Sequence, residues 1–172
     1  MANESWSLDG GIHEVPLPQV GGRLWLCGKH VVGPDPDAAL QRVEADTIVC
    51  LVEQHELADR YPNYVAWLSA APPTRAVRFP INDLSAPGLT TMRPFLDDLV
   101  ARLRRGDGLI VHCGAGIGRA GTTAVAVLVL LGEPLDAALT QVRAHRPMAG
   151  PEGGMQMALV RALADDVARS AE

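Results

Sequence analysis

The stretch Gly108-Leu-Ile-Val-His-Cys113 runs directly into Gly114-Ala-Gly-Ile-Gly-Arg119, and an apolar run from Ala120 to Leu131 follows at once. The first six residues are mostly apolar and predict a short buried strand, while the final run predicts a buried helix. The glycines between them allow the backbone to turn without side-chain clashes. A strand, a glycine-rich loop and a helix in this order are typical of an α/β fold. Because ligands of such sheets bind at the carboxyl ends of the strands, Cys113 is expected at a ligand site.

The residue types in the loop suit phosphoryl transfer. Backbone N–H groups that turn inward beside a helix N-terminus bind anions, and the same field stabilises a cysteine thiolate. The guanidinium of Arg119 offers two parallel donors to phosphoryl oxygens. The stretch therefore predicts a phosphocysteine chemistry. The alternative is a buried structural cysteine before a glycine-rich turn, although so many glycines are costly in a loop that binds nothing.

Four segments together resemble one enzyme family. The motif His112-Cys113-Gly-Ala-Gly-Ile-Gly-Arg119 resembles the signature loop of the cysteine-dependent protein phosphatases, the tyrosine and dual-specificity superfamily. The chain is similar to a compact, bacterial-like member. The other three resembling segments are the strand and turn Thr47–Glu53 with Glu56-Leu57, the general-acid loop Phe79-Pro80-Ile81-Asn82-Asp83 with Pro87, and the glutamine segment Arg146-Pro147, Pro151-Glu152 and Gln156.

The resemblance implies a role for each residue of the loop. Cys113 would attack phosphorus, and Arg119 would hold two phosphoryl oxygens. His112 would orient the cysteine from below the loop rather than act as a base. The equatorial oxygens would be held by the backbone amides of Gly114, Ala115, Gly116, Ile117, Gly118 and Arg119.

Two further catalytic residues are implied outside the loop. Asp83 would protonate the leaving oxygen and then activate water; the alternative is an ordinary turn residue in a proline-rich loop. Gln156 would position the hydrolytic water; the alternative is a polar residue on a helix surface. Arg143 and Arg146 are expected to pair with acidic side chains rather than to act in catalysis.

Ala120 departs from the family pattern, in which a serine or threonine follows the loop arginine. In relatives that hydroxyl bonds the cysteine sulfur and helps it leave. Its absence predicts slow breakdown of the phosphoenzyme, unless Thr122 or Thr123 substitutes for it.

The expected fold is α/β and phosphatase-like: a single domain over residues 1–172 with a central, mostly parallel sheet of four to five strands flanked by helices. Residues 1–17 are expected to be loosely held. The expected strands are Leu24–Cys27, Thr47–Val52, Ala76–Ile81 and Leu109–Cys113. The expected helices are 36–43 capped by Asp35, 56–69 interrupted by Pro62, 90–105 capped by Thr90 with Asp97, Asp98 and Arg102 on its exposed face, 120–131, 134–145 and 152–168.

Composition limits the partners. The net charge of −5 argues against nucleic acid and against an anionic membrane surface as partners. The chain opens without a signal peptide and its longest apolar run, 124–131, is too short to span a bilayer, so a cytoplasmic protein is expected.

The other two of the three cysteines, Cys27 and Cys50, lie in apolar runs. They are read as core residues, or one of them forms a reversible disulfide with Cys113.

The expected activity is hydrolysis of phosphotyrosine, with phosphoserine and phosphothreonine as further substrates, in a phosphorylated protein or a small phosphomonoester. The neutral residues at positions 114–118 favour a singly phosphorylated group over a multiply phosphorylated lipid. No metal or cofactor is expected, and the chain is expected to be a monomer. Two alternatives are a catalytically weak phosphate-binding module and a rhodanese-like sulfurtransferase, although the latter needs no general-acid loop.

Overall fold

A five-stranded sheet forms the centre of the computed structural model, which describes residues 11–172. The strand order is β1-β2-β5-β3-β4. Strands β2, β5, β3 and β4 are parallel, and β1 pairs antiparallel with β2. The expectation of a mostly parallel sheet of four to five strands is therefore confirmed. The strands are β1 (Ile12–Val15), β2 (Arg23–Gly28), β3 (Thr47–Cys50), β4 (Ala76–Arg78) and β5 (Gly108–Cys113).

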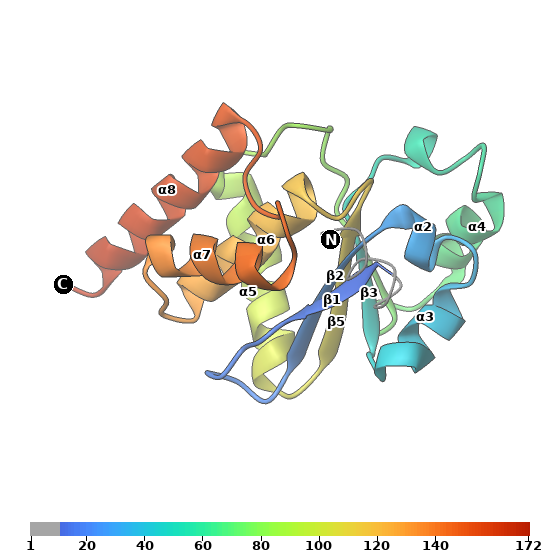
Figure 1. Ribbon diagram of the computed structural model, residues 1–172, viewed down its shortest axis with the longest axis horizontal. Helices are drawn as coiled ribbons and strands as arrows, with labels where there is room; N and C mark the ends of the chain where they lie inside the picture. Colours follow the sequence, from blue (N-terminus) through green and yellow to red (C-terminus); the bar gives the residue numbers. More distant parts are fainter. Residues whose placement is uncertain (1–10) are drawn as a thin grey trace.

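Helices cover both faces of this sheet (Figure 1). Four of them lie on one face and three short ones on the other, which gives three layers in the order α, β, α. The first group is α5 (Leu89–Arg104), α6 (Gly118–Leu130), α7 (Leu135–His145) and α8 (Gly154–Ser170). The second group is α2 (Lys29–Val32), α3 (Pro36–Val43) and α4 (Pro62–Ala70), and a 3₁₀ turn, η1 (Gln54–Glu56), precedes α4.

The core is centred on β5 and α6. Every residue of β5 is buried, and α6 is buried from Gly118 to Val129 because α5, α7, α8 and the sheet surround it. A helix that is apolar all round must be enclosed in this way. The strand and helix that flank the glycine loop are thus the most enclosed elements, and they give the loop a rigid base.

Three expectations about helices were wrong in detail. Pro62 begins α4 instead of interrupting a helix, since its fixed φ suits a first turn. Gly88, not Thr90, precedes α5 and supplies no side-chain cap. Arg102 is buried rather than exposed, because its guanidinium reaches the Pro73 carbonyl at 2.8 Å.

The expectation of a loosely held N-terminal segment was wrong for β1, and residues 1–10 lie outside the described part of the chain. Ile12 and Val15 are buried, and β1 pairs along its whole length with β2. Two apolar side chains and a ladder of hydrogen bonds suffice to order this edge strand.

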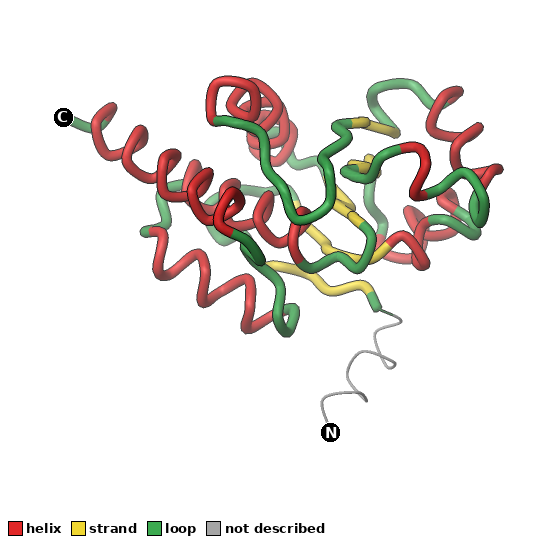
Figure 2. The backbone as a smooth tube through the Cα atoms, turned by 90° about the horizontal axis from the view of Figure 1, so that it is seen from above, coloured by secondary structure: helices red, strands yellow, loops and turns green. Residues whose placement is uncertain are grey.

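The parallel strands all end at one edge of the sheet, the upper edge in Figure 1. Figure 2 looks onto that edge, where loops lie between the two groups of helices. Along residues 11–172, no helix has the length and apolar character needed to cross a membrane.

Candidate active site

The loop between β5 and α6 lies directly on the end of β2. The Gly114 carbonyl accepts a hydrogen bond from the Lys29 amide at 3.1 Å. Gly116 has a φ of +75°, and a Cβ there would lie 2.3 Å from the carbonyl carbon of Cys27. Only glycine tolerates both that backbone conformation and that approach. Gly116 therefore allows the loop to curl back over the sheet.

Cys113 lies buried at the last position of β5, paired with Gly28 of β2. The other two cysteines, Cys27 and Cys50, are also buried thiols. Burial raises the pKa of Cys27 to about 12 and raises that of Cys50 as well. Both thiols are therefore protonated near neutral pH, as expected of core residues. A disulfide between either of them and Cys113 stays a prediction.

Arg119 is held by a carboxylate that the sequence did not assign to the site. Its Nη1 and Nη2 donate to Glu56 at 2.8 and 2.9 Å, and Nη1 also donates to the Ile81 carbonyl at 2.9 Å. Partial burial acts to raise the pKa of Glu56, but the bonds from Arg119 and from the Glu53 amide hold that pKa below its usual range. Glu56 is therefore ionised at neutral pH and fixes the guanidinium above the loop.

The expected acid loop lies against this arginine. Asp83 Oδ1 is 3.4 Å from Arg119 Nη2, and it also accepts the Leu84 amide at 2.9 Å. The Asp83 side chain is 71% exposed, so it faces solvent at the mouth of the site. The Ile81 bond to Arg119 holds the start of the same loop. Asp83 thus lies beside the arginine of the phosphate loop, and its role as general acid stays a prediction.

Gln156 is a buried bridge and not a residue on a helix surface. Its Oε1 accepts the Glu152 amide at 2.8 Å and the Thr122 hydroxyl at 3.3 Å, while its Nε2 reaches the Ser85 carbonyl at 3.3 Å. Its Oε1 would lie 3.3 Å from a Cβ at Gly118. The glutamine therefore joins α8, α6 and the acid loop beside the phosphate loop. That it positions water stays a prediction.

His112 makes a second buried contact that sequence reasoning missed. Its Nδ1 lies 3.2 Å from the Cys113 carbonyl, and its Nε2 lies 2.6 Å from the Tyr64 hydroxyl. Burial lowers the pKa of His112 to about 4, so the ring is neutral near pH 7. A carbonyl can only accept, so Nδ1 carries the proton and Tyr64 donates to Nε2. Tyr64 thereby fixes the tautomer of the ring below the loop.

Arg146 braces the loop from behind. Its guanidinium donates to the carbonyls of Gly116 and Ala115 at 2.7 and 2.8 Å and to the Gly11 carbonyl at 2.9 Å. It also donates to His13 Nδ1 at 2.6 Å. Among the described residues these partners are carbonyls and an imidazole, so pairing of Arg146 with an acidic side chain stays a prediction. Those loop carbonyls point away from the amides that would face a phosphate.

Ala120 is completely buried, and both nearby threonine hydroxyls are committed elsewhere. The Thr122 hydroxyl donates to Gln156, and the Thr123 hydroxyl donates to the Arg119 carbonyl at 2.9 Å. A hydroxyl has one proton to donate. Neither threonine therefore replaces the missing hydroxyl in this conformation.

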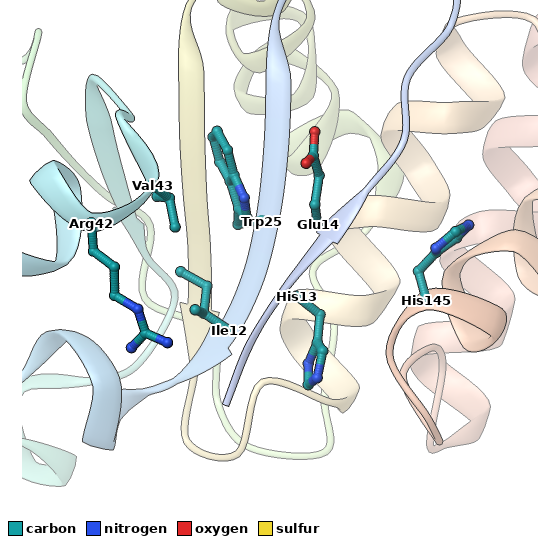
Figure 3. A pocket seen from close by; sticks show the side chains of 7 residues that line it. All are labelled: Ile12, His13, Glu14, Trp25, Arg42, Val43 and His145. Atoms are coloured by element: carbon teal, nitrogen blue, oxygen red, sulfur yellow. The ribbon is translucent and has the colours of Figure 1, made fainter. Parts of the chain in front are cut away.

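Two other features could be taken for ligand sites. Ligand atoms of Glu53, His55 and Glu56 lie within 4.8 Å of one another, but the capping box of η1 and the Arg119 ion pair account for both carboxylates. A pocket of about 440 Å³ opens at the β1 edge (Figure 3), lined by residues that include Trp25 and His145. It contains none of the predicted catalytic residues.

A cysteine at a strand end, an arginine above it and a facing aspartate define a cysteine-based phosphatase. Residues 26–172 match the family described as "PTP-SAK: Swiss Army Knife protein, DSP-PTPase phosphatase domain". The chain belongs to this family. No curated protein matches the sequence.

Solved structures agree with the fold. Tk-PTP in its active form is 26% identical, with 87% of this chain and 99% of that chain covered and a TM-score of 0.66. The kinase-associated phosphatase KAP is 21% identical, with 91% and 95% covered and a TM-score of 0.75. PTPMT1 in complex with PI(5)P is 14% identical, with 94% and 99% covered and a TM-score of 0.73.

Proposed function

We propose that the protein hydrolyses phosphomonoesters of phosphorylated proteins, phosphotyrosine first and phosphoserine and phosphothreonine as well, through a phosphocysteine intermediate. One observation carries this proposal. The Arg119 guanidinium contacts the acid loop at Ile81 and Asp83 while it follows the Cys113 loop in sequence. This contact brings the acid loop against the arginine of the phosphate loop, which supports a shared role for Cys113, Arg119 and Asp83.

In the first step the Cys113 thiolate attacks phosphorus. The bond from phosphorus to the leaving oxygen breaks, and that oxygen takes a proton from the carboxylic acid of Asp83. Within the described residues, Glu56 and Ile81 use three of the five N–H donors of Arg119. The N–H on Nε and the second one on Nη2, which faces Asp83 Oδ1 at 3.4 Å before substrate binds, would donate to two phosphoryl oxygens.

In the second step water attacks the phosphocysteine. The Asp83 carboxylate takes a proton from the water, the phosphorus–sulfur bond breaks, and the Cys113 thiolate is released with inorganic phosphate. Gln156, which lies beside Gly118 and bonds the acid loop at Ser85, would help position that water. Because Ala120 supplies no hydroxyl to the departing sulfur, this step is expected to be the slow one.

The test is release of p-nitrophenol from p-nitrophenyl phosphate under reducing conditions, followed from the first turnover. Wild type should release product, and Cys113→Ser should not. Removal of the acid in Asp83→Ala should lower turnover by about 10²–10⁴-fold on a poor leaving group. Unchanged turnover in Asp83→Ala would rule out its role. Phosphotyrosine and phosphothreonine peptides compared in the same assay give the substrate preference.

Ala120 favours a second candidate, a phosphate-binding module of little activity. No product from wild type, together with bound vanadate, would identify that module. An initial burst followed by a slower phase would instead show that the intermediate accumulates. Ala120→Ser should then speed the slower phase. Slow breakdown of the phosphoenzyme would be refuted if wild type showed no burst and Ala120→Ser had the same turnover rate as wild type. Transfer of sulfur from thiosulfate to cyanide would point to the sulfurtransferase.

A further inference from the structure

Large exposed apolar side chains follow or precede residues of the candidate active site in the sequence. Within residues 11–172 they are Leu84, Met148 and Met155, at 59%, 67% and 59% exposure. Leu84 follows Asp83, Met155 precedes Gln156, and Met148 lies two residues after Arg146. Exposed apolar side chains that lie side by side mark a surface that contacts another molecule.

Leu84 and Met155 belong to two segments that touch. The Ser85 hydroxyl lies 3.6 Å from the sulfur of Met155, and a Cβ at Gly153 would lie 3.2 Å from the Leu84 carbonyl oxygen. Leu84 has a φ of +61°, a conformation that suits glycine or asparagine better than leucine. Neither the backbone nor burial therefore explains a leucine at this position.

An apolar groove continues from Met155. It measures about 310 Å³ and lies between the end of the acid loop and α8. Its walls are residues 86–88 of the loop, Leu89 at the start of α5, and Met155, Ala158, Leu159 and Ala162 of α8, all apolar side chains or glycine. Met155 lines the groove and also contacts Ser85, two residues after Asp83, so the groove adjoins the acid loop.

We infer that this groove, which Met155 lines, and the exposed Leu84 on the adjoining acid loop together bind apolar side chains of the protein substrate next to the phosphorylated residue. The inference rests on the proposed function. The groove lacks the basic side chains that attract an anionic lipid surface, and the chain as a whole carries a charge of −5. Its volume is near the lower end of ligand pockets, which suits one or two side chains.

The test compares two phosphotyrosine peptides that are otherwise identical: in one, leucines flank the phosphotyrosine, and in the other, glutamines do. Wild type should have a kcat/KM about 10-fold higher or more for the leucine peptide, as hydrophobic pockets discriminate on this scale. Met155→Gln should bring the ratio of the two values to about 3 or less, and Leu84→Asn should lower it in the same direction. Both side chains are exposed, so neither change disturbs the core.

Met148→Gln is the matched control, because Met148 is even more exposed but neither lines the groove nor belongs to the acid loop. It should keep the wild-type ratio; an equal loss of preference would overturn the groove as its source. Equal hydrolysis of both peptides by wild type would overturn the inference and leave the proposed function intact. Faster hydrolysis of a monophosphorylated lipid in phosphatidylcholine vesicles, abolished by Met155→Gln, would assign the groove to an acyl chain instead. No hydrolysis of either peptide or of p-nitrophenyl phosphate would remove the proposed function and the inference together.

Discussion

At Gly116 a hydrogen atom in place of a side chain allows the phosphate loop to lie on β2. A Cβ would be 2.4 Å from the Cys27 carbonyl oxygen, and the φ of +75° disfavours any other residue. Gly116→Ala should therefore lower the free energy of unfolding by about 2–4 kcal/mol and weaken phosphate binding. Urea unfolding and vanadate titration measure the two effects.

Gly154→Ala is the control for that change. A Cβ at Gly154 meets nothing within 4 Å, and the residue begins α8, where alanine favours the helix. Its stability should be equal to wild type or slightly higher. If the two alanine variants were destabilised equally, the close approach to Cys27 would not be the cause.

Glu56 is a second residue on which the site depends, because its carboxylate holds the Arg119 guanidinium. Glu56→Gln removes the nearer and more buried of the two carboxylates beside Arg119, so it should cost about 1–3 kcal/mol of stability at pH 7. The folded state holds the pKa of Glu56 below its ordinary value of 4.5. The ion pair therefore stabilises the fold above pH 4.5, and this stabilisation is lost as pH falls through the lower, folded pKa.

The measurement is urea unfolding of wild type and Glu56→Gln between pH 7 and pH 3. The difference in stability between the two proteins should be constant above pH 4.5 and should shrink below it. A difference that does not change over the whole range would contradict the ion pair.

Between elements, α4 and β5 are joined by the bond from Tyr64 to His112. Tyr64→Phe removes the donor to Nε2, so the imidazole should populate both tautomers, which nitrogen NMR shifts of His112 report. The phosphate loop above the ring would then adopt more than one arrangement, so kcat/KM should fall about 10-fold. A single unchanged tautomer in Tyr64→Phe would contradict this positioning role.

The buried ring also predicts a pH dependence of folding. His112 has a pKa of about 4 in the folded protein against an ordinary value of 6.5. The unfolded chain therefore binds more protons between these values, and stability should fall by roughly 3 kcal/mol as pH is lowered from 6.5 to 4. Thermal unfolding of wild type and His112→Gln over this range tests it, and an equal slope in both would be contrary evidence.

The sequence allows candidate site residues to be chosen where the information is local. Cys113 and Arg119 share one loop with the strand and helix that position it, and Asp83 stands in a recognisable proline-rich segment. The contacts of Glu56 with Arg119 and of Tyr64 with His112 span 63 and 48 residues and depend on tertiary packing. No spacing rule reports such contacts.

The same distinction between local sequence and tertiary packing explains which helices and strands could be predicted. The apolar β5 and α6 were predictable because their whole surface is buried. Strand β1 was missed because His13 and Glu14 interrupt its apolar character, and its order comes from its partner β2. Pro62 was read as an interruption because a proline suits both the end and the first turn of a helix.

For the whole molecule, the site joins segments that are far apart in sequence, so an anion that binds it should stabilise the entire fold. Phosphate at about 100 times its Kd should add about 2.7 kcal/mol of stability, which raises Tm by roughly 5–10 °C for a chain of this size. Calorimetry with increasing phosphate measures the shift. Arg119→Ala should abolish it, and an equal shift in that variant would place the anion elsewhere.

Because Arg146 supports the phosphate loop, the order in which residues are synthesised determines when that support can form. Gly116 leaves the ribosome 30 residues before Arg146, the side chain that holds its carbonyl, and Gly11, another partner of that guanidinium, leaves 135 residues before it. A nascent chain that has already exposed Cys113 therefore still lacks the support for its anion-binding loop. The thiol is expected to become reactive only after Arg146 has been made and joins β1 to the phosphate loop.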